Sequence, residues 1–472
     1  MATSATRIGT LGLLALLAVS ACSGGFGGAP ASTGPTTAPT TAPATAPATA
    51  TASEPASAAA SPSEAAEAPV TLNWYVDDNN VTQARLQGLS DAYTKLHPNV
   101  KIEIETHPGG TDGDNLVKTR LSTGDMPDMF YYNSGSLLQA LNPADTLVDL
   151  KDQPFVGNLQ ASYLPTVTAP NGAIVGVPTE GSLGGGVLYN KKVYSDLGLS
   201  VPKTWAEFEA NNQKIKDAGK VAPVCATFAD TWTSQLFVLA DYYNVQVADP
   251  TFAADYTANK AHYADTPAAQ AGFAHLQEAF DKGWWQKDFG ADKFETGQQK
   301  LAEGKCAHYP MLTFAVGTIV ENYPDAKDSI GVFGQPGTDA ATNGATIWMP
   351  AATYIPKTTT GPKLDAAKAF VNFIGSVDGC NAMTAGVAPS GPYVVKGCTL
   401  PDDVPQAIKD IQPYIDGGNN SPALEFLSPV KGPSLENITT AVGSGQTKAG
   451  EAAKQYDQDV EKQAKQLGLP GW

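Results

Sequence analysis

The sequence has few histidines and lacks the short motifs that mark common catalytic centres. Its five histidines stand at positions 97, 107, 262, 275 and 308, and their spacing does not match that of metal ligands. G-x-S-x-G, H-E-x-x-H, the P-loop and G-x-G-x-x-G are all absent, which argues against the enzyme classes that depend on them. Carboxylates are plentiful, so a cell-surface carbohydrate-active enzyme such as a glycosidase is the alternative that composition leaves open.

Positive charge is also scarce. Lysine and arginine together number 30 and aspartate and glutamate 47, so the formal net charge is −17 at pH 7. Such an acidic chain is repelled by phosphate groups, which argues against nucleic acid or an acidic membrane patch as a partner. The sequence also has no internal repeat, which argues against a structural or adhesive surface protein built from repeated modules.

No apolar run is long enough to cross a membrane. The N-terminal run, Ile8–Val19, follows Arg7 and has about a dozen residues, whereas a bilayer-spanning helix needs about 20. A short apolar run between a basic residue and small residues is typical of a signal peptide. Val19-Ser20-Ala21-Cys22 resembles a lipobox. We therefore predict that residues 1–21 are removed and that acyl chains on Cys22 anchor the protein to the outer face of the cell membrane.

Residues 22–69 form a low-complexity segment made almost entirely of Ala, Thr, Pro, Ser and Gly. Its charged residues are Glu54, Glu64 and Glu67. With no apolar periodicity, such a segment cannot offset the entropy lost on ordering. We predict a disordered, Pro-rich tether between the lipid anchor and the body.

Four cysteines follow Cys22, an even number that suits disulfides in an oxidising compartment. Cys380 and Cys398 flank a loop rich in Gly and Pro, which favours a local bridge. Cys225 with Cys306 then follows by elimination. Metal binding is the alternative, but neither C-x-x-C nor Cys/His spacing supports it, and we predict no metal and no cofactor.

The body alternates strand and helix patterns. Period-two alternation marks strands near 70–76 and 100–104, and helical periodicity marks residues 81–96. This β-α rhythm predicts a parallel α/β arrangement, and about 400 residues are too many for one compact core, which predicts two lobes. Further strands are expected near 129–132, 174–177 and 186–189. Further helices are expected near 115–122, 135–141, 204–219, 233–243, 267–282, 293–303, 365–376 and 449–467.

Four phrases in fixed order resemble the family 1 extracellular solute-binding proteins of ABC importers. They are LSDAYTKLHPNVKIEIE, LVKTRLSTGDMPDMFYYN, AIVGVPTEGSLGGGVLYNKKVYSDLGLSVPKTWAEF and FETGQQKLAEGKCAHYPMLTF. The resemblance implies a two-lobed, type II periplasmic-binding-protein-like α/β fold with its ligand in a cleft between lobes joined by crossing segments. Lobe 1 would contain residues 70–178 and 328–380, and lobe 2 residues 182–327 and 388–472.

The same resemblance implies function. The chain would be a monomeric, non-enzymatic receptor that captures a carbohydrate and delivers it to the permease subunits of an ABC importer. Several aromatic residues in one cleft favour an oligosaccharide as that carbohydrate. A sugar presents C–H faces that stack on aromatic rings and hydroxyls that need fixed donors and acceptors. Ligand contacts should therefore be aromatic and short polar residues near strand ends.

Eight residues fit that description. Asp78 and Asn79 end the first strand, Tyr132 and Asn133 follow the PDMF strand, and Glu180 follows Gly-Val-Pro at the first crossing. In the second lobe, Trp232 precedes a helix and Phe314 occupies the aromatic position after the GKCAHYP phrase. Trp348 lies in the segment returning to the first lobe. By contrast, Trp205 and His308 are interpreted as packing residues.

Overall fold

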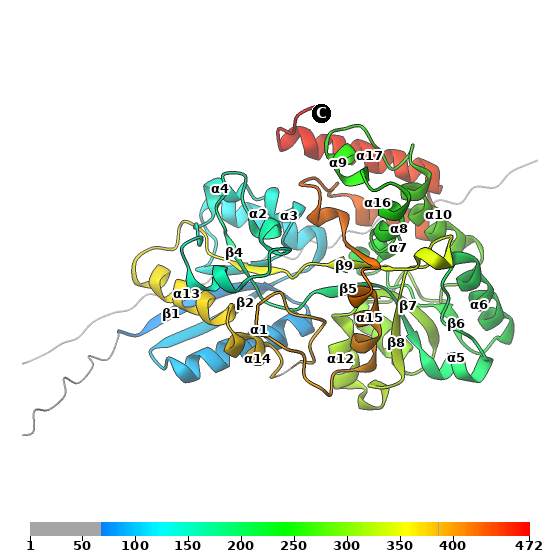
Figure 1. Cartoon of the computed structure of the whole chain (residues 1–472), viewed down its shortest axis with the longest axis horizontal. Helices are drawn as coiled ribbons and strands as arrows, with labels where there is room; N and C mark the ends of the chain where they lie inside the picture. The colour runs from blue at the N-terminus through cyan, green and yellow to red at the C-terminus, as the bar shows by residue number, and fades with distance from the viewer. Residues whose placement is uncertain (1–67, 386) are drawn as a thin grey trace, which may run out of the picture. The chain divides into compact units, whose positions relative to one another are not determined.

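The computed structural model describes residues 68–385 and 387–472, so the predicted signal peptide, Cys22 and nearly all of the tether lie outside the described residues. Two β-sheets organise the described part (Figure 1). We call the five-stranded sheet and the helices packed on it the five-stranded half, and the six-stranded sheet with its helices the six-stranded half. Each half has its own buried core.

The five-stranded half follows the order β2-β1-β3-β10-β4. β1 is parallel to β2 and β3, as the β-α rhythm predicts, whereas β10 runs antiparallel to both β3 and β4. Alternation along β1 buries Leu72, Trp74 and Val76, and the Trp74 ring meets Phe370 edge-on. The strands are β1 (Val70–Asp77), β2 (Val100–His107), β3 (Met129–Tyr132), β4 (Gly176–Pro178) and β10 (Ala352–Tyr354).

Helices cover this sheet, and Figure 1 places α1, α2, α13 and α14 around it. Asn79 accepts hydrogen bonds from the amides of Val81 and Thr82 and so caps the N-terminus of α1. The helices are α1 (Asn80–Leu96), α2 (Gly110–Thr123), α3 (Ser136–Gln139), α4 (Pro143–Thr146), α13 (Gly361–Ile374) and α14 (Val377–Met383), with the 3-10 turns η1 (Pro154–Asn158) and η2 (Leu164–Val167).

The six-stranded half follows the order β11-β9-β5-β7-β6, with β8 also paired to β5. β5 is buried along its whole length, and β7, β8 and β9 all run antiparallel to it. The strands are β5 (Leu183–Asn190), β6 (Ala222–Val224), β7 (Cys306–Leu312), β8 (Ile330–Gly334), β9 (Ala345–Trp348) and β11 (Asn420–Pro422).

Two of its helices, α6 and α10, begin where the sequence signals predict. Thr204 and Glu207 form the expected capping box at α6, and Pro267 opens α10. The helices are α5 (Lys191–Leu197), α6 (Trp205–Ala218), α7 (Leu236–Leu239), α8 (Tyr242–Ala248), α9 (Phe252–Thr257), α10 (Pro267–Asp281), α11 (Phe294–Ala302), α12 (Ala315–Asn322), α15 (Gln406–Asp416), α16 (Leu435–Gly443) and α17 (Ala449–Gln466). The 3-10 turns are η3 (Thr231–Gln235), η4 (Pro324–Ala326), η5 (Ala340–Thr342) and η6 (Leu424–Phe426).

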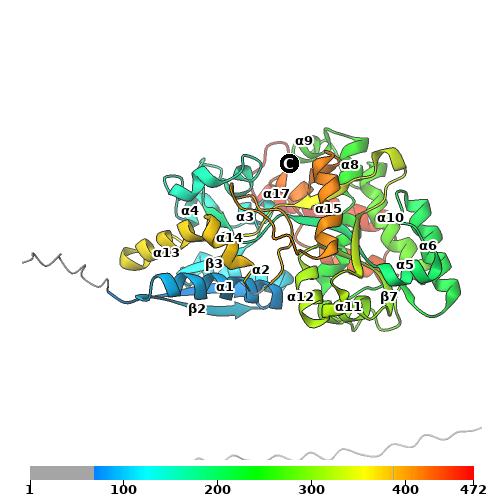
Figure 2. The ribbon, with the colours of Figure 1, turned by 60° about the horizontal axis from the view of Figure 1, so that its bottom comes forward.

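Three segments cross between the halves, namely residues 179–182, 349–351 and 384–405. They lie side by side: the Thr179 amide donates to the Ala351 carbonyl, and the Ser182 amide donates to the Pro392 carbonyl. A Cβ on Gly181 would lie 2.3 Å from the Gly391 carbonyl oxygen, so glycine permits this close approach. The halves also meet where α12 lies beside α1 (Figure 2).

The chain re-enters the five-stranded half at a later residue than the sequence predicted. Residues 328–380 were expected in lobe 1, but β8 and β9 pair with β5, so the return begins only at β10. Conversely, Tyr393 was expected in lobe 2, but it packs in the core of the five-stranded half. The physical reason is pairing: β5 offers an unfilled edge to two short strands, and the Cys380–Cys398 bridge holds the segment after α14 against the first core.

Candidate ligand-binding site

The crossing segments are held by a buried ion pair. Arg85 Nη1 on α1 lies 2.5 Å from Glu180 Oε2, and both side chains are almost fully buried. The other carboxylate oxygen, Glu180 Oε1, accepts a hydrogen bond from the Ala351 amide at 3.1 Å. Glu180 therefore joins α1 to two of the three crossings. Both of its oxygens are engaged within the protein, so any contact with ligand would use their remaining lone pairs.

Asp77 lies in the same cluster. Its Oδ1 accepts a hydrogen bond from the Asn79 amide, and burial raises the pKa of Asp77 to about 7. The Asn79 amide opposes this rise, as does Arg85, whereas the charge of Glu180 adds to it. Neither Asp77 nor Arg85 was predicted from the sequence. The available signals were the abrupt polar run that ends β1, to which Asp77 belongs, and a cation, Arg85, on the buried face of α1.

The predicted residues of β1 and β3 differ in what they contact. Asp78 is exposed, and Asn79 serves as the cap of α1. Tyr132 is buried, whereas Asn133 is exposed and its carbonyl accepts a hydrogen bond from the Tyr354 hydroxyl. Because side chains alternate along a strand, Tyr131 rather than its neighbour faces the charged cluster. Burial, with the charges of Glu180 and Asp77, raises the pKa of Tyr131 well above its usual range.

The six-stranded half contributes a cluster of three aromatic residues, Trp232, Phe294 and Phe314, which we call the aromatic group. The rings of Trp232 and Phe314 are half-buried, and Phe294 lies behind them with 1% of its surface exposed. Phe294 stacks on Phe314 at 5.4 Å between ring centroids and lies 5.2 Å from Trp232. The structure thus brings together two predicted aromatics from distant parts of the chain. Phe294, which was not predicted from the sequence, packs against both rings.

Trp348 is more deeply buried than a ligand-stacking residue needs to be. It has 7% of its surface exposed and packs with Leu183, Ala240 and Ala423. Its ring lies across Gly185, where a Cβ would come within 2.1 Å of it. Phe314 packs against the same group, so Trp348 continues the aromatic group into the core.

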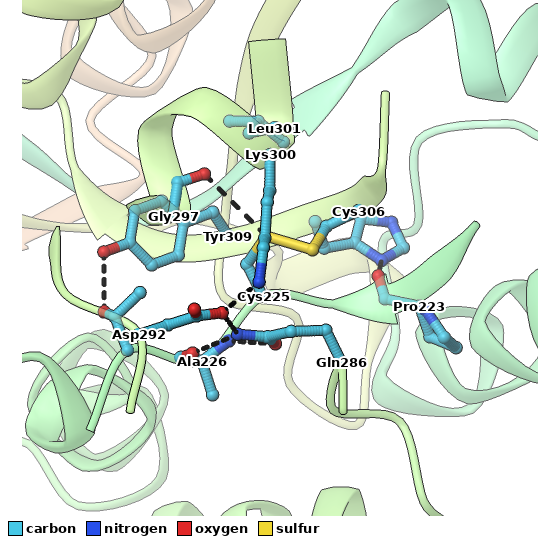
Figure 3. Close-up of a disulfide and its surroundings, with 12 residues drawn as sticks. Pro223, Cys225, Ala226, Gln286, Asp292, Gly297, Lys300, Leu301, Cys306 and Tyr309 are labelled. Carbon is cyan, nitrogen blue, oxygen red and sulfur yellow. Dashed lines mark hydrogen bonds and ion pairs between the residues drawn. A yellow bond between two sulfur atoms is a disulfide. The ribbon is translucent and has the colours of Figure 1, made fainter. Parts of the chain in front are cut away.

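A disulfide and polar contacts hold the segment that leads into the turn carrying Trp232. Cys225 and Cys306 are joined, as predicted by elimination, and link the end of β6 to the start of β7 (Figure 3). The Ala226 amide donates to Gln286 Oε1, and Gln286 Nε2 in turn donates to Asp292. Asp230 Oδ2 accepts a hydrogen bond from the Phe294 amide at 2.7 Å. These contacts hold the turn before any ligand arrives.

Two residues interpreted as packing residues from the sequence are confirmed as such. His308 is fully buried, its Nε2 lies 2.8 Å from the Tyr194 hydroxyl, and burial lowers the pKa of His308 to about 3. Trp205 stacks on His275 with 3.5 Å between ring centroids. Within residues 68–385 and 387–472, no group of three or more His, Cys, Asp or Glu side chains could hold a metal ion. No helix in that part is both long and apolar enough to cross a membrane.

Comparison with known proteins identifies the class. Residues 78–379 match the family described as bacterial extracellular solute-binding protein, and the chain belongs to that family. The match includes every ligand contact predicted from the sequence, from Asp78 to Trp348.

Curated relatives agree with this assignment. The chain is 24% identical over 293 residues to the multiple sugar-binding protein of Streptococcus mutans, covering 60% of this chain and 66% of the relative, just under two thirds of its length. It is 22% identical over 333 residues to the melibiose/raffinose/stachyose-binding protein MelE of Bacillus subtilis, covering 70% of this chain and 76% of the relative.

Solved structures share the fold. A chitin oligosaccharide binding protein superposes with a TM-score of 0.71 at 21% identity, covering 84% of this chain and 99% of the other. The solute-binding protein RafE in complex with raffinose gives a TM-score of 0.67 at 21% identity, with the same coverage. The predicted fold class, a type II periplasmic-binding-protein-like α/β fold, is confirmed.

Proposed function

We propose that this protein is the carbohydrate receptor of an ABC importer and captures an oligosaccharide between its two halves. The observation that carries the proposal is the aromatic group of Trp232, Phe314 and Phe294. Two half-exposed rings backed by a buried third give a firm surface on which sugar C–H faces can stack. The names of the sugar-binding relatives support the same ligand class.

The polar part of the site would come from the other half. Asp78 and Asn133 are exposed at the ends of β1 and β3, where ligands of open α/β sheets bind. The Asp78 carboxylate can accept hydrogen bonds from sugar hydroxyls, and the Asn133 amide can both donate to them and accept from them. The described part offers few cations at these positions, which favours a neutral ligand over an acidic one.

The two halves would be the two lobes. We assign residues 70–178 and 352–383 to lobe 1 and residues 183–348 and 406–472 to lobe 2, with hinge motion at the three crossings. Cys22 would carry the lipid anchor and residues 22–69 the tether, so a monomeric receptor could reach both the solute and the permease subunits.

A thermal-shift screen tests the function. Mono- and oligosaccharides, including raffinose, stachyose and chitin oligosaccharides, are added to the folded protein, and at least one should raise the melting temperature by mass action. The bound saccharide should be recovered unchanged. Trp232→Ala should abolish the shift, whereas Trp205→Phe, a change in a packing residue, should keep it. No shift with any saccharide rules out the carbohydrate assignment, and a normal shift in Trp232→Ala rules out the site.

A further inference from the structure

A buried carboxylate links the two halves beside the aromatic group. Glu436 lies on α16, whose Leu435 and Val442 pack in the core of the six-stranded half, and 7% of its surface is exposed. Its Oε1 accepts a hydrogen bond from the Thr111 hydroxyl at 2.5 Å and from the Thr111 amide at 3.3 Å. Thr111 belongs to the opposite half.

The partner of Glu436 is the N-terminus of a helix. Thr111 stands in the first turn of α2, whose Val117 and Leu121 pack in the core of the five-stranded half. The first amides of a helix have no partner within the helix, and they favour a negative charge. Gly109, at the N-cap position, has no side chain with which to cap these amides, and the first-turn Asp112 is exposed. Glu436 therefore caps α2 from across the boundary between the halves.

The same oxygen also holds the turn that carries Trp232. Glu436 Oε1 accepts a third hydrogen bond, at 3.0 Å, from the Thr231 hydroxyl, and Thr231 directly precedes Trp232. The Ser234 hydroxyl in the same turn donates to the Glu436 carbonyl at 3.1 Å. One carboxylate oxygen thus joins α2 of one half to the aromatic group of the other.

We propose that Glu436 is a positioning residue that couples closure of the two halves to the placement of Trp232, and so sets ligand affinity. The role in affinity rests on the proposed function, whereas the role in closure does not. When the halves separate, Thr111 leaves Glu436 and the cap of α2 is lost. When they close, the negative charge is returned to the helix N-terminus and Trp232 is held in place. Hydrogen bonds to a charged group are among the stronger ones, so loss of this carboxylate should weaken saccharide binding by roughly tenfold or more.

The test measures closure without ligand. Spin labels are placed in the full chain at two exposed positions, Lys95 on α1 and Lys214 on α6. They are attached through a non-natural amino acid rather than a cysteine, so that the labelling does not exchange with the disulfides. Pulsed electron-paramagnetic-resonance distances then report the separation of the halves. Glu436→Ala and Thr111→Val should each populate longer distances than the wild-type protein, and the double variant should add little to either. Glu436→Gln, which keeps the shape and one oxygen, should lie between the wild-type protein and Glu436→Ala.

Asp459 provides a matched control. Its carboxylate accepts hydrogen bonds from the amide and hydroxyl of Ser434, as Glu436 does from Thr111, but both residues lie in the six-stranded half. Asp459→Asn should lower the melting temperature and leave the distances unchanged. Distances in Glu436→Ala that coincide with those of the wild-type protein, or that change equally in Asp459→Asn, overturn the proposal. A protein that shows this coupling but binds no saccharide contradicts the proposed function alone.

Discussion

Arg85 and Glu180 form a buried ion pair that joins α1 to two crossing segments. Removing one partner of such a pair leaves a buried charge without compensation, which costs about 3–5 kcal/mol. Arg85→Met should therefore lower the free energy of unfolding by roughly that amount in urea denaturation. The exposed pair Lys192–Asp196 is the control, because exposed pairs contribute about 0–1 kcal/mol and Lys192→Met should change little. Equal effects of the two substitutions would show that the buried pair does not hold the crossings.

Asp241 should make stability depend on pH. It has 2% of its surface exposed, and burial raises its pKa to about 7, a rise that the polar side chains of Asn244 and Gln335 oppose. Among the described residues, Asp241 Oδ2 and Gln335 Oε1 are buried without a hydrogen bond, and a proton on the carboxyl suits two such acceptors.

The direction of the effect follows from the higher pKa in the folded state. The folded protein holds the Asp241 proton that the unfolded chain releases near pH 4, so the stabilisation is complete below pH 4 and is lost as pH rises to about 7. At about 1.4 kcal/mol per pKa unit, the loss is on the order of a few kcal/mol. Asp241→Asn should remove this loss. Unfolding free energies measured from pH 4 to 8 that fall in parallel for both proteins would contradict the assignment.

The two disulfides should differ in what they contribute. Cys225–Cys306 closes 81 residues and Cys380–Cys398 closes 18. A cross-link lowers the entropy of the unfolded chain more when the loop is longer. This effect predicts a stabilisation of about 4.5 kcal/mol from the first disulfide and about 3 kcal/mol from the second. Two double variants, each with both cysteines of one disulfide replaced by alanine, are unfolded in a calorimeter. The melting temperature should fall more when Cys225 and Cys306 are replaced than when Cys380 and Cys398 are replaced. The reverse order would show that strain or residual structure outweighs loop length.

Asn79 has a structural role that can be separated from ligand contact. As the cap of α1, Asn79→Ala should cost about 1 kcal/mol, whereas Asn79→Asp should preserve the cap. If the side chain also touches sugar, Asn79→Asp should weaken saccharide binding at unchanged stability, because aspartate loses the amide donor. Unchanged binding in Asn79→Asp would limit this residue to its capping role.

Local patterns predicted much of the fold. The alternation of apolar and polar residues over 70–76 predicted β1, and the capping box at Thr204 predicted the start of α6. Strand partners were not predictable, because short apolar segments such as β8 and β9 carry no signal for which edge they fill. The helix expected over 233–243 is divided into η3, α7 and α8. Backbone groups near the break between α7 and α8 bond outside the segment, because the Thr346 hydroxyl donates to the Ala240 carbonyl and accepts from the Tyr243 amide.

The candidate site was predictable in residue type more than in arrangement. Phe314 was identified by its position in a family phrase and Trp232 by its place before a helix, and the structure brings them to one aromatic group. Phe294 and Arg85 were missed, because their roles depend on contacts with residues far away in sequence. Glu436 was missed for the same reason, since its three hydrogen bonds join segments more than two hundred residues apart.

Calorimetric titration of the folded protein with oligosaccharides is the most direct test of carbohydrate binding at the aromatic group. We expect saturable binding of one saccharide per chain, and Phe314→Ala, which removes one exposed ring of the aromatic group, should weaken it by roughly tenfold. Val316→Ala, a nearby buried change outside that group, should leave affinity unchanged while lowering stability. Absence of binding heat with every saccharide, at temperatures on both sides of 25 °C, would contradict the account.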